Sequence, residues 1–387
     1  MCPDTMLALS GERFHVAYRI AGDETEARAR AAEICVDQTI EFPLDLVPRS
    51  DILDGIVGRI ESLAPVDGQH WEATISYPVE ISGLDLMGFL NVVFGTISMK
   101  WGIRVERFDL PPALLRASRG PRFGRGGLRA LLGAPDRPLV ATALKPLGLA
   151  PADLAAQAYR FALGGVDIIK DDHILANHSF CPYRERVERC GEAVRRANRE
   201  TGYSSLYAPT VPGPVDRMFE RAMIAKEAGA GALLVCPGLA GLDMMRCLAD
   251  DDRLGLPVIS NPACQATYAT GGEIGLSWRA LFGQVARLAG ADASIFGHHG
   301  SQFAGSERDC REAAAGCESP MGHIRPIFPM PAGGITVGRL PEFIRFYGCD
   351  VVFLVSTGLY RPGPDLTANA RAFRRAVERP PLTRYAD

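Results

Sequence analysis

The strongest candidate for chemistry in this sequence is a short apolar segment that ends in ionisable residues. The segment Val166–Ile169 runs without a break into Lys170, Asp171, Asp172 and His173. If the segment is a buried strand, it brings an amine, two carboxylates and an imidazole to one place. Carboxylate oxygens suit hard divalent cations and imidazole suits softer ones, so Asp172 and His173 are plausible metal ligands. The alternative is a charged strand end with internal salt bridges.

Lysine is scarce in the chain, which draws attention to the lysines that remain. Of 42 lysines and arginines, only four are lysines, at positions 100, 145, 170 and 226. A buried lysine can lose its proton and act as a base or nucleophile, which arginine cannot do. Beside a metal, the amine of Lys170 would be repelled or would become an anion, for example by carbamylation with CO2. Lys145 follows the apolar run Val140–Leu144 and is a second candidate, the alternative being a side chain that extends into solvent.

From about residue 138 onward, short apolar runs alternate with helix-period segments. Eight alternating units in this length predict a closed (β/α)8 TIM barrel, with an open doubly wound sheet as the alternative. No GxGxxG turn follows the first run, which argues against a dinucleotide-binding version of the open sheet. The predicted strands are Val140–Leu144, Val166–Ile169, Ser205–Ala208, Ala232–Cys236, Pro257–Ser260, Ala293–Phe296, Ile327–Met330 and Val351–Val355.

The first 120 or so residues lack this rhythm and predict a separate α+β domain. We place the domains at residues 1–122 and 123–387, because a stretch rich in Pro, Arg and Gly separates the two patterns. The predicted elements of the first domain are strands at Phe14–Ile20, Trp71–Tyr77 and Arg104–Leu110 and helices at Glu24–Cys35, Asp51–Ser62 and Leu84–Phe94.

In a barrel of this kind, chemistry collects where strands end and the following loops begin. The sixth run leads into His298 and His299 between glycines, which suggests acid–base work, a metal or an oxyanion contact. We assign His298 to acid–base work and His299 to the substrate. Chance surface histidines are the alternative. Gly333-Gly334 follows the seventh run and Ser356-Thr357-Gly358 the eighth, where backbone N–H groups of barrels often bind phosphate.

Composition excludes several other classes of function. The net charge of −3, without a long run of one sign, gives no support for binding nucleic acid or a membrane surface. There is no basic-then-apolar leader and no apolar run of 18 residues, so a cytoplasmic protein is expected. The ten cysteines include no CxxC pair, which argues against a zinc site or a disulfide framework.

The residues around Lys170 resemble a known family. The segment Val166–Asp172, preceded by Gly164-Gly165, is similar to the activator-lysine motif of the ribulose-bisphosphate carboxylase large-chain family. The resemblance runs from about residue 10 to about residue 365. Its supporting segments are Phe123-Gly124, Asp136–Leu139, Leu144–Pro146, Gly148-Leu149, Asn91–Gly95 and Ala332–Ile335.

This resemblance implies a ferredoxin-like N-terminal domain ahead of the barrel, and a homodimer whose active site is shared between subunits. It also implies that Lys170 is carbamylated and binds Mg²⁺ together with Asp172, and that Lys145 moves protons during enolisation. By the same resemblance, Asp37 and Asn91 would reach a neighbouring active site.

Departures from the family pattern argue against CO2 fixation. His173 stands where the family has a third metal carboxylate, which leaves Mn²⁺ or another divalent ion as an alternative to Mg²⁺. Leu147 replaces a second lysine, and Asn261-Pro262 replaces a phosphate-binding His-Arg pair. No lysine follows Lys226, so the lysine of the family's closing loop is absent. The chain therefore resembles the RuBisCO-like branch, type IV.

The sequence predicts a metal-dependent enzyme that forms an enolate from a phosphorylated keto sugar or keto sugar acid. We favour a decarboxylase, because no hydrophobic collar for a methylthio group is evident and the segment from Gly297 to Gln302 is polar. An enolase or isomerase of a methylthio-sugar phosphate is the first alternative. A non-catalytic regulatory relative and an unrelated aldolase with a Schiff-base lysine are the others.

Overall fold

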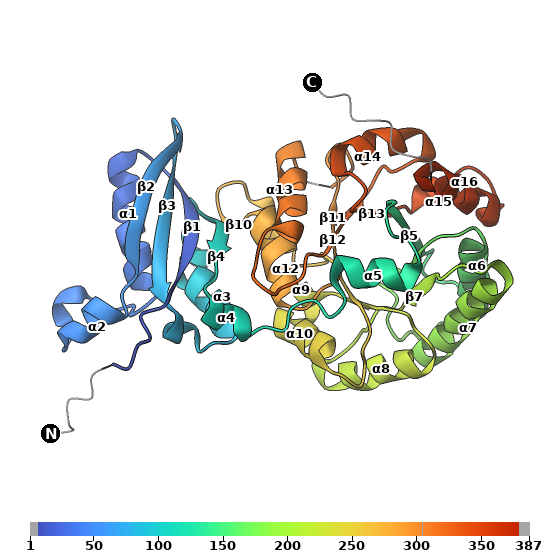
Figure 1. The fold of residues 1–387 in the computed structure, drawn as a ribbon, viewed down its shortest axis with the longest axis horizontal. Coiled ribbons are helices and arrows are strands. Elements are labelled where there is room, and N and C mark those ends of the chain that lie inside the picture. The colour runs from blue at the N-terminus through green and yellow to red at the C-terminus, as the bar shows by residue number, and fades with distance from the viewer. Residues whose placement is uncertain (1–6, 304, 379–387) are drawn as a thin grey trace.

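The computed structural model describes residues 7–303 and 305–378, which form an N-terminal mixed sheet and a parallel barrel (Figure 1). Both parts of the expected architecture, the (β/α)8 barrel and the α+β domain ahead of it, are confirmed. Within the described residues, no helix is long and apolar enough to cross a membrane.

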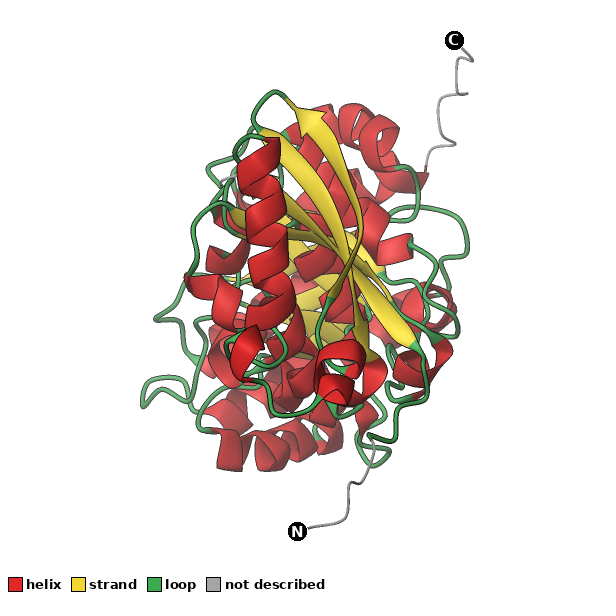
Figure 2. Ribbon diagram, turned by 90° about the vertical axis from the view of Figure 1, so that its left-hand side faces the viewer, coloured by secondary structure: helices red, strands yellow, loops and turns green. Residues whose placement is uncertain are grey.

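The N-terminal sheet has the strand order β10-β4-β1-β3-β2. Its inward face alternates along β1, where Phe14, Val16, Tyr18 and Ile20 are all fully buried. Helices pack against this face, and Figure 2 looks onto the domain with its strands in front of the barrel. The elements are β1 (Arg13–Ala21), α1 (Glu24–Asp37), α2 (Ser50–Gly55), β2 (Arg59–Asp67), β3 (His70–Pro78), α3 (Leu86–Phe94), β4 (Ile103–Asp109) and α4 (Pro112–Arg116).

One predicted element of this domain is wrong in its second half. The segment Asp51–Ser62 was expected to be a helix, but α2 ends at Gly55 and the strand β2 begins at Arg59. β2 is an edge strand whose side chains are mostly exposed, so it lacks the apolar alternation that would have identified it.

The barrel sheet has the order β7-β6-β5-β13-β12-β11-β9-β8, and a parallel bridge between Thr210 and Leu234 joins its two ends. Alternate residues such as Ile168, Ile259 and Ile295 fill the interior. The strands are β5 (Leu139–Leu144), β6 (Ile168–Asp171), β7 (Leu206–Ala208), β8 (Leu233–Val235), β9 (Val258–Ser260), β11 (Ala293–Gly297), β12 (Phe328–Ala332) and β13 (Val352–Leu354).

An outer layer of helices surrounds the barrel strands (Figure 1). It includes a π-helical segment, η4 (Arg279–Val285), which continues directly into α12 (Ala286–Leu288). The other helices are α5 (Gly124–Leu132), α6 (Pro151–Leu163), α7 (Tyr183–Thr201), α8 (Val215–Glu227), α9 (Pro237–Ala240), α10 (Leu242–Asp250), α11 (Thr267–Thr270), α13 (Glu307–Glu318), α14 (Leu340–Tyr347), α15 (Thr357–Tyr360) and α16 (Leu366–Glu378). Short 3₁₀ turns lie at Leu44–Leu46, Val79–Ser82, Thr96–Met99 and Val337–Arg339.

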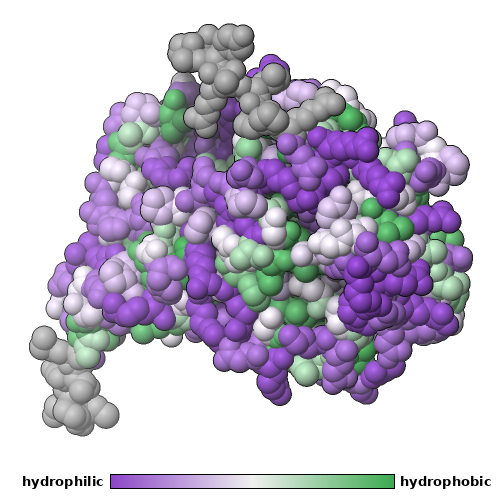
Figure 3. Space-filling view, turned by 45° about the vertical axis from the view of Figure 1, so that its right-hand side comes forward, coloured by the Kyte–Doolittle hydropathy of each residue, from purple (hydrophilic) through white to green (hydrophobic). Residues whose placement is uncertain are grey.

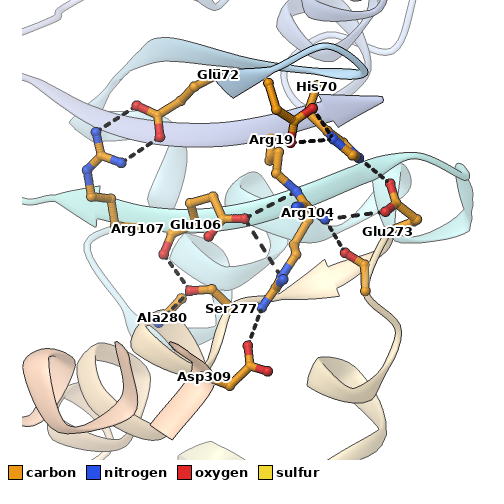
Figure 4. A network of polar contacts seen from close by, with 12 residues as sticks. Arg19, His70, Glu72, Arg104, Glu106, Arg107, Glu273, Ser277, Ala280 and Asp309 are labelled. Atoms are coloured by element: carbon orange, nitrogen blue, oxygen red, sulfur yellow. Dashed lines mark hydrogen bonds and ion pairs between the residues drawn. The ribbon is translucent and has the colours of Figure 1, made fainter. Parts of the chain in front are cut away.

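The two parts of the chain are tied together by a strand that the sequence did not predict. After β9 the chain makes a two-residue strand, β10 (Gly275–Leu276), which pairs in parallel with β4. Ser277 continues the contact, because its N–H donates to the carbonyl of Val105 at 2.8 Å. Ion pairs surround this junction, among them His70 with Glu273 at 2.9 Å (Figure 4). The loop after β9 is therefore anchored on the N-terminal sheet.

Candidate active site

The strand β6 leads into the predicted ionisable cluster, but the strand ends two residues later than predicted. Lys170 and Asp171 belong to the strand itself, where they pair with Ala143 and Leu144 of β5. The predicted strand ended at Ile169, so this boundary was wrong. Pairing on both sides buries the cluster: Lys170 is 2% exposed, Asp171 0% and Asp172 2%.

Asp171 is fixed by the protein and is not free to bind a ligand. Its Oδ2 accepts from Arg186 Nε at 3.1 Å and from the N–H of Thr210 at 3.2 Å. Its Oδ1 accepts from the Tyr207 hydroxyl at 2.8 Å. Burial raises the pKa of Asp171, while Arg186, which is also fully buried, opposes that rise. Nothing in the sequence distinguished Arg186, which lies among several arginines on the amphipathic helix α7.

Asp172 stands between two cationic or potentially cationic groups. Lys145 Nζ forms an ion pair with its Oδ2, and His173 Nδ1 lies 2.9 Å from its Oδ1. Burial opposes ionisation, but the hydrogen bonds from His173 and Lys145 hold the pKa of Asp172 well below its usual range. Asp172 is therefore an anion in an otherwise buried place.

Lys170 has the properties of an amine that can be neutral near physiological pH. Burial lowers the pKa of Lys170 to about 8, against the opposing effect of Asp172. Its Nζ donates to the carbonyl of Asp171 at 2.9 Å.

These residues fit a metal only if Lys170 supplies one of the ligands. Among the described residues no group of three His, Cys, Asp or Glu side chains could hold an ion, so Asp172 and His173 do not suffice alone. A carbamate on Lys170 would add a third ligand group, with oxygen donors, next to Asp172. The donor set fits a divalent cation on that condition.

Lys145 follows β5, and its backbone is held from two helices. Gln157 of α6 donates from Nε2 to the carbonyl of Lys145 at 2.6 Å, and its Oε1 accepts from the Lys145 N–H at 3.3 Å. Tyr360 of α15 accepts from the same N–H at 3.2 Å and donates to the carbonyl of Ala143 at 3.0 Å. The Lys145 side chain is half-exposed. Neither Gln157 nor Tyr360 carried a signal in the sequence.

His298 contacts helix α14 through a hydrogen bond and ring packing. Its Nδ1 lies 2.9 Å from the hydroxyl of Tyr347, and its ring packs 4.2 Å from that of Phe343, both on α14. Burial lowers the pKa of His298 to about 4, so the ring is neutral. His299 donates its N–H to Cys310 Sγ at 3.3 Å and packs against Phe346. Their expected acid–base and substrate-contacting roles remain predictions.

The two predicted phosphate-binding segments lie against each other. Gly333 and Gly334, after β12, have φ angles of +104° and +67°, which a side chain would strain. Gly358, after β13, approaches Ile335 so closely that an added Cβ would lie 2.3 Å from its carbonyl oxygen. Ser356 and Thr357 precede Gly358 on the second segment. Phosphate binding by these residues remains a prediction.

Asp37 and Asn91 lie in the N-terminal domain, on α1 and α3, whose places are seen in Figure 1. Asp37 pairs with Lys100 at 2.5 Å, while the Asn91 side chain is exposed. Their expected place in the active site of a neighbouring subunit remains a prediction.

Exposed apolar side chains lie on the segments that follow the barrel strands, at the mouth of the barrel. The sequence had not indicated an apolar surface there. Of the exposed large apolar residues in the described part of the barrel, only Leu131 lies elsewhere, on α5. Figure 3 shows apolar side chains bordered by hydrophilic ones on the barrel half of the molecule. The mouth residues lie on the segments after seven of the eight strands and are Leu147, Ile174, Phe180, Val215, Leu239, Tyr268, Phe303 and Val337.

Comparison with known proteins gives a family. Residues 126–380 match the model of the ribulose bisphosphate carboxylase large chain, catalytic domain. The chain belongs to this family. The resemblance noted at Lys170 is therefore confirmed, and relatives place the chain in the RuBisCO-like branch.

The relatives span nearly the whole chain. Ribulose bisphosphate carboxylase-like protein 1 of Rhodopseudomonas palustris is 37% identical, over 95% of this chain and 98% of the relative. 5-Methylthioribulose-1-phosphate isomerase of Rhodospirillum rubrum is 34% identical, over 95% and 96%. Among solved structures, the dimeric archaeal Rubisco of Hyperthermus butylicus matches with a TM-score of 0.84 at 27% identity, over 96% of this chain and 91% of that one.

Proposed function

We propose that this protein is a metal-dependent enzyme that enolises a phosphorylated keto sugar. The observation that carries the proposal is the buried pair of Lys170 and Asp172, with Lys145 in contact with the same carboxylate. A buried amine whose pKa is lowered beside a carboxylate is costly to keep and is typical of functional sites. We infer that Lys170 reacts with CO2 to give a carbamate and a proton, and that Mg²⁺ or a similar ion binds there with Asp172 and His173.

In this mechanism the cation, when bound, supplies Lewis-acid stabilisation of the enolate oxygen. Lys145 removes the proton from the carbon next to the carbonyl and returns it at the end. Because its Nζ contacts Asp172, Lys145 lies beside one of the residues that would hold the metal. Asp171 and Arg186 hold the strand that presents Lys170 and Asp172.

The remaining predicted residues would bind the rest of the substrate. Gly333, Gly334 and the segment 356–358 would hold one phosphate group through backbone N–H groups. With Asn261-Pro262 in place of a His-Arg pair, a monophosphate suits the site better than a bisphosphate.

For the substrate we now favour a methylthio-sugar phosphate over a keto sugar acid. A decarboxylase was preferred partly because no hydrophobic collar was evident. The apolar side chains around the mouth remove that reason, because they offer a surface to a methylthio group. The relative from Rhodospirillum rubrum, an isomerase of 5-methylthioribulose 1-phosphate, points the same way.

We also propose that the chain works as a homodimer, with Asp37 and Asn91 of one subunit close to the barrel mouth of the other. The N-terminal domain carries its own exposed apolar side chains, which a partner would cover: Phe42, Leu44, Leu46, Leu84, Met87, Met99 and Trp101. The dimeric state of the archaeal relative supports this proposal.

The test is proton exchange in D2O with Mg²⁺ and bicarbonate. The substrates are 5-methylthioribulose 1-phosphate and a 3-oxo sugar-acid phosphate. We expect deuterium to enter next to the carbonyl of the methylthio sugar, and Lys170→Ala or removal of metal to abolish it. Release of CO2 from the sugar acid without exchange in the methylthio sugar would reinstate the decarboxylase. A Lys170→Ala enzyme with normal turnover would refute the mechanism.

A further inference from the structure

We propose that Gln157 and Tyr360 are positioning residues that fix Lys145 for proton transfer, a role that rests on the proposed function. At the end of β5 both side chains bond backbone atoms, so we class them as positioning and not as catalytic residues. Four hydrogen bonds connect the pair to this strand end: Gln157 Nε2 to Lys145 O, Lys145 N to Gln157 Oε1, Lys145 N to Tyr360 Oη and Tyr360 Oη to Ala143 O.

The two side chains also support each other. The Tyr360 hydroxyl lies 3.1 Å from Gln157 Oε1, so its single proton is shared between that oxygen and the carbonyl of Ala143. The Tyr360 ring packs edge-on against Phe161 of α6, with 5.4 Å between ring centroids. Gln157 and Tyr360 therefore form one unit between α6 and α15, and we call this unit the clamp.

The position of the clamp explains why it would matter for Lys145 in particular. The Lys145 side chain is half-exposed, so little packing fixes its amine, in contrast to the buried Lys170. The backbone at Lys145 is then the part that the protein can hold rigidly. A displacement of about 1 Å at a catalytic group can cost about a hundredfold in rate, so two side chains that fix this backbone would protect the rate.

Tyr360 also connects Lys145 to the segment proposed to bind phosphate. It ends α15, whose first residues are Thr357 and Gly358, immediately after Ser356. A substrate phosphate held at 356–358 and the proton-transferring Lys145 would then be joined through one short helix.

The test combines kinetics with chemical labelling in Gln157→Leu, Tyr360→Phe and Gln157→Glu. We expect kcat to fall about thirtyfold in Gln157→Leu and about fivefold in Tyr360→Phe, because each change removes two hydrogen bonds to the strand end. KM and the affinity for Mg²⁺ should stay unchanged, and Gln157→Glu, which keeps an acceptor for the Lys145 N–H, should recover part of kcat. Tyr159→Phe is the matched control, because it removes a hydroxyl on the same helix. That hydroxyl bonds Glu200 and not the end of β5.

Labelling gives a readout that does not need turnover. The chain has four lysines, so an amine-acylating reagent followed by peptide mass spectrometry reports on each one separately. In metal-free protein at one pH, we expect Lys145 to react at least about threefold faster in Gln157→Leu and Tyr360→Phe, because its ion pair with Asp172 is loosened. Lys100 and Lys226 serve as internal references and should not change, nor should Lys145 in Tyr159→Phe.

The outcomes separate the two proposals. If Lys145 reacts faster in the variants but the parent enzyme turns over no keto sugar phosphate, the clamp stands and the proposed function fails. If the parent is active while the folded variants keep both kcat and the labelling rate of Lys145, the clamp is refuted. Should Gln157→Leu fail to fold, Tyr360→Phe, which keeps the ring in place, decides the question.

Discussion

Two regions of this molecule are dense in charge, yet they differ in what the charges do. At the domain junction, arginines and carboxylates form matched pairs that stay partly open to solvent, such as Arg107 with Glu72 (Figure 4). At the end of β6, the charges are buried, and the hydrogen-bond partner of Lys170 among the described residues is a backbone carbonyl. The pairing of opposite charges is enough to explain the first region as a structural contact between the two domains. The cost of burying an amine without such a partner marks the second as a site.

The sharpest test of this contrast is to remove the amine itself. Lys170→Ala should lower turnover by at least about a thousandfold, because the proposed Lewis-acid stabilisation is lost with the metal ligand. The measurement is kcat, together with Mg²⁺ binding by calorimetry with and without bicarbonate. Lys226→Ala, on the distant helix α8, should leave both unchanged. CO2-stimulated metal binding that survives in Lys170→Ala would contradict the assignment.

Breaking an ion pair in each region should cost very different amounts of stability. Arg186→Met leaves Asp171 buried without its cation and should lower the free energy of unfolding by about 3–5 kcal/mol. Arg107→Met breaks a two-bond pair with Glu72 at the surface and should cost less than about 1 kcal/mol. Urea unfolding of both variants measures the difference. Equal losses would show that burial does not distinguish the two regions.

Activation by CO2 should depend on pH in the direction set by Lys170. Only the neutral amine reacts with CO2, and with a pKa of about 8 roughly a tenth of Lys170 is neutral at pH 7 and half at pH 8. The rate of activation by CO2 and Mg²⁺, followed as the lag before steady turnover, should therefore rise from pH 6 to pH 8 and level off above it. A rate that is flat over this range would contradict the lowered pKa.

The smallest effect is expected at the junction. Burial opposes protonation of His70, but its hydrogen bonds to Asp67 and Glu273 raise the pKa of the imidazole. Its stabilising effect is therefore complete below about pH 6.5 and is lost as pH rises through the raised pKa. His70→Gln should lower the midpoint of thermal unfolding by a few degrees at most at pH 6, and by less at pH 9. A larger loss at pH 9 than at pH 6 would contradict this reading.

The sequence was sufficient for the barrel and for its central cluster, because buried parallel strands are continuous apolar runs and Lys170 follows one of them. It failed where a residue's role depends on partners distant in the chain. β2 is an exposed edge strand, β10 is two residues long, and neither has a periodicity to detect. Tyr360 bonds the backbone of Lys145 and Ala143 across 215 and 217 residues, which composition and spacing do not encode. His298 was placed after the right strand, but the pattern did not show that its ring would pack against α14.

The pairing of β10 with β4 bears on how the protein can be divided for experiments. A fragment that ends at residue 122 would lack β10, so the outer edge of β4 would present unpaired N–H and C=O groups to other molecules. A fragment that begins at residue 123 would leave the loop after β9 without its anchor. Neither half of the chain is expected to be well behaved alone, and fusion or truncation designs should keep residues 103–109 and 275–276 in one polypeptide.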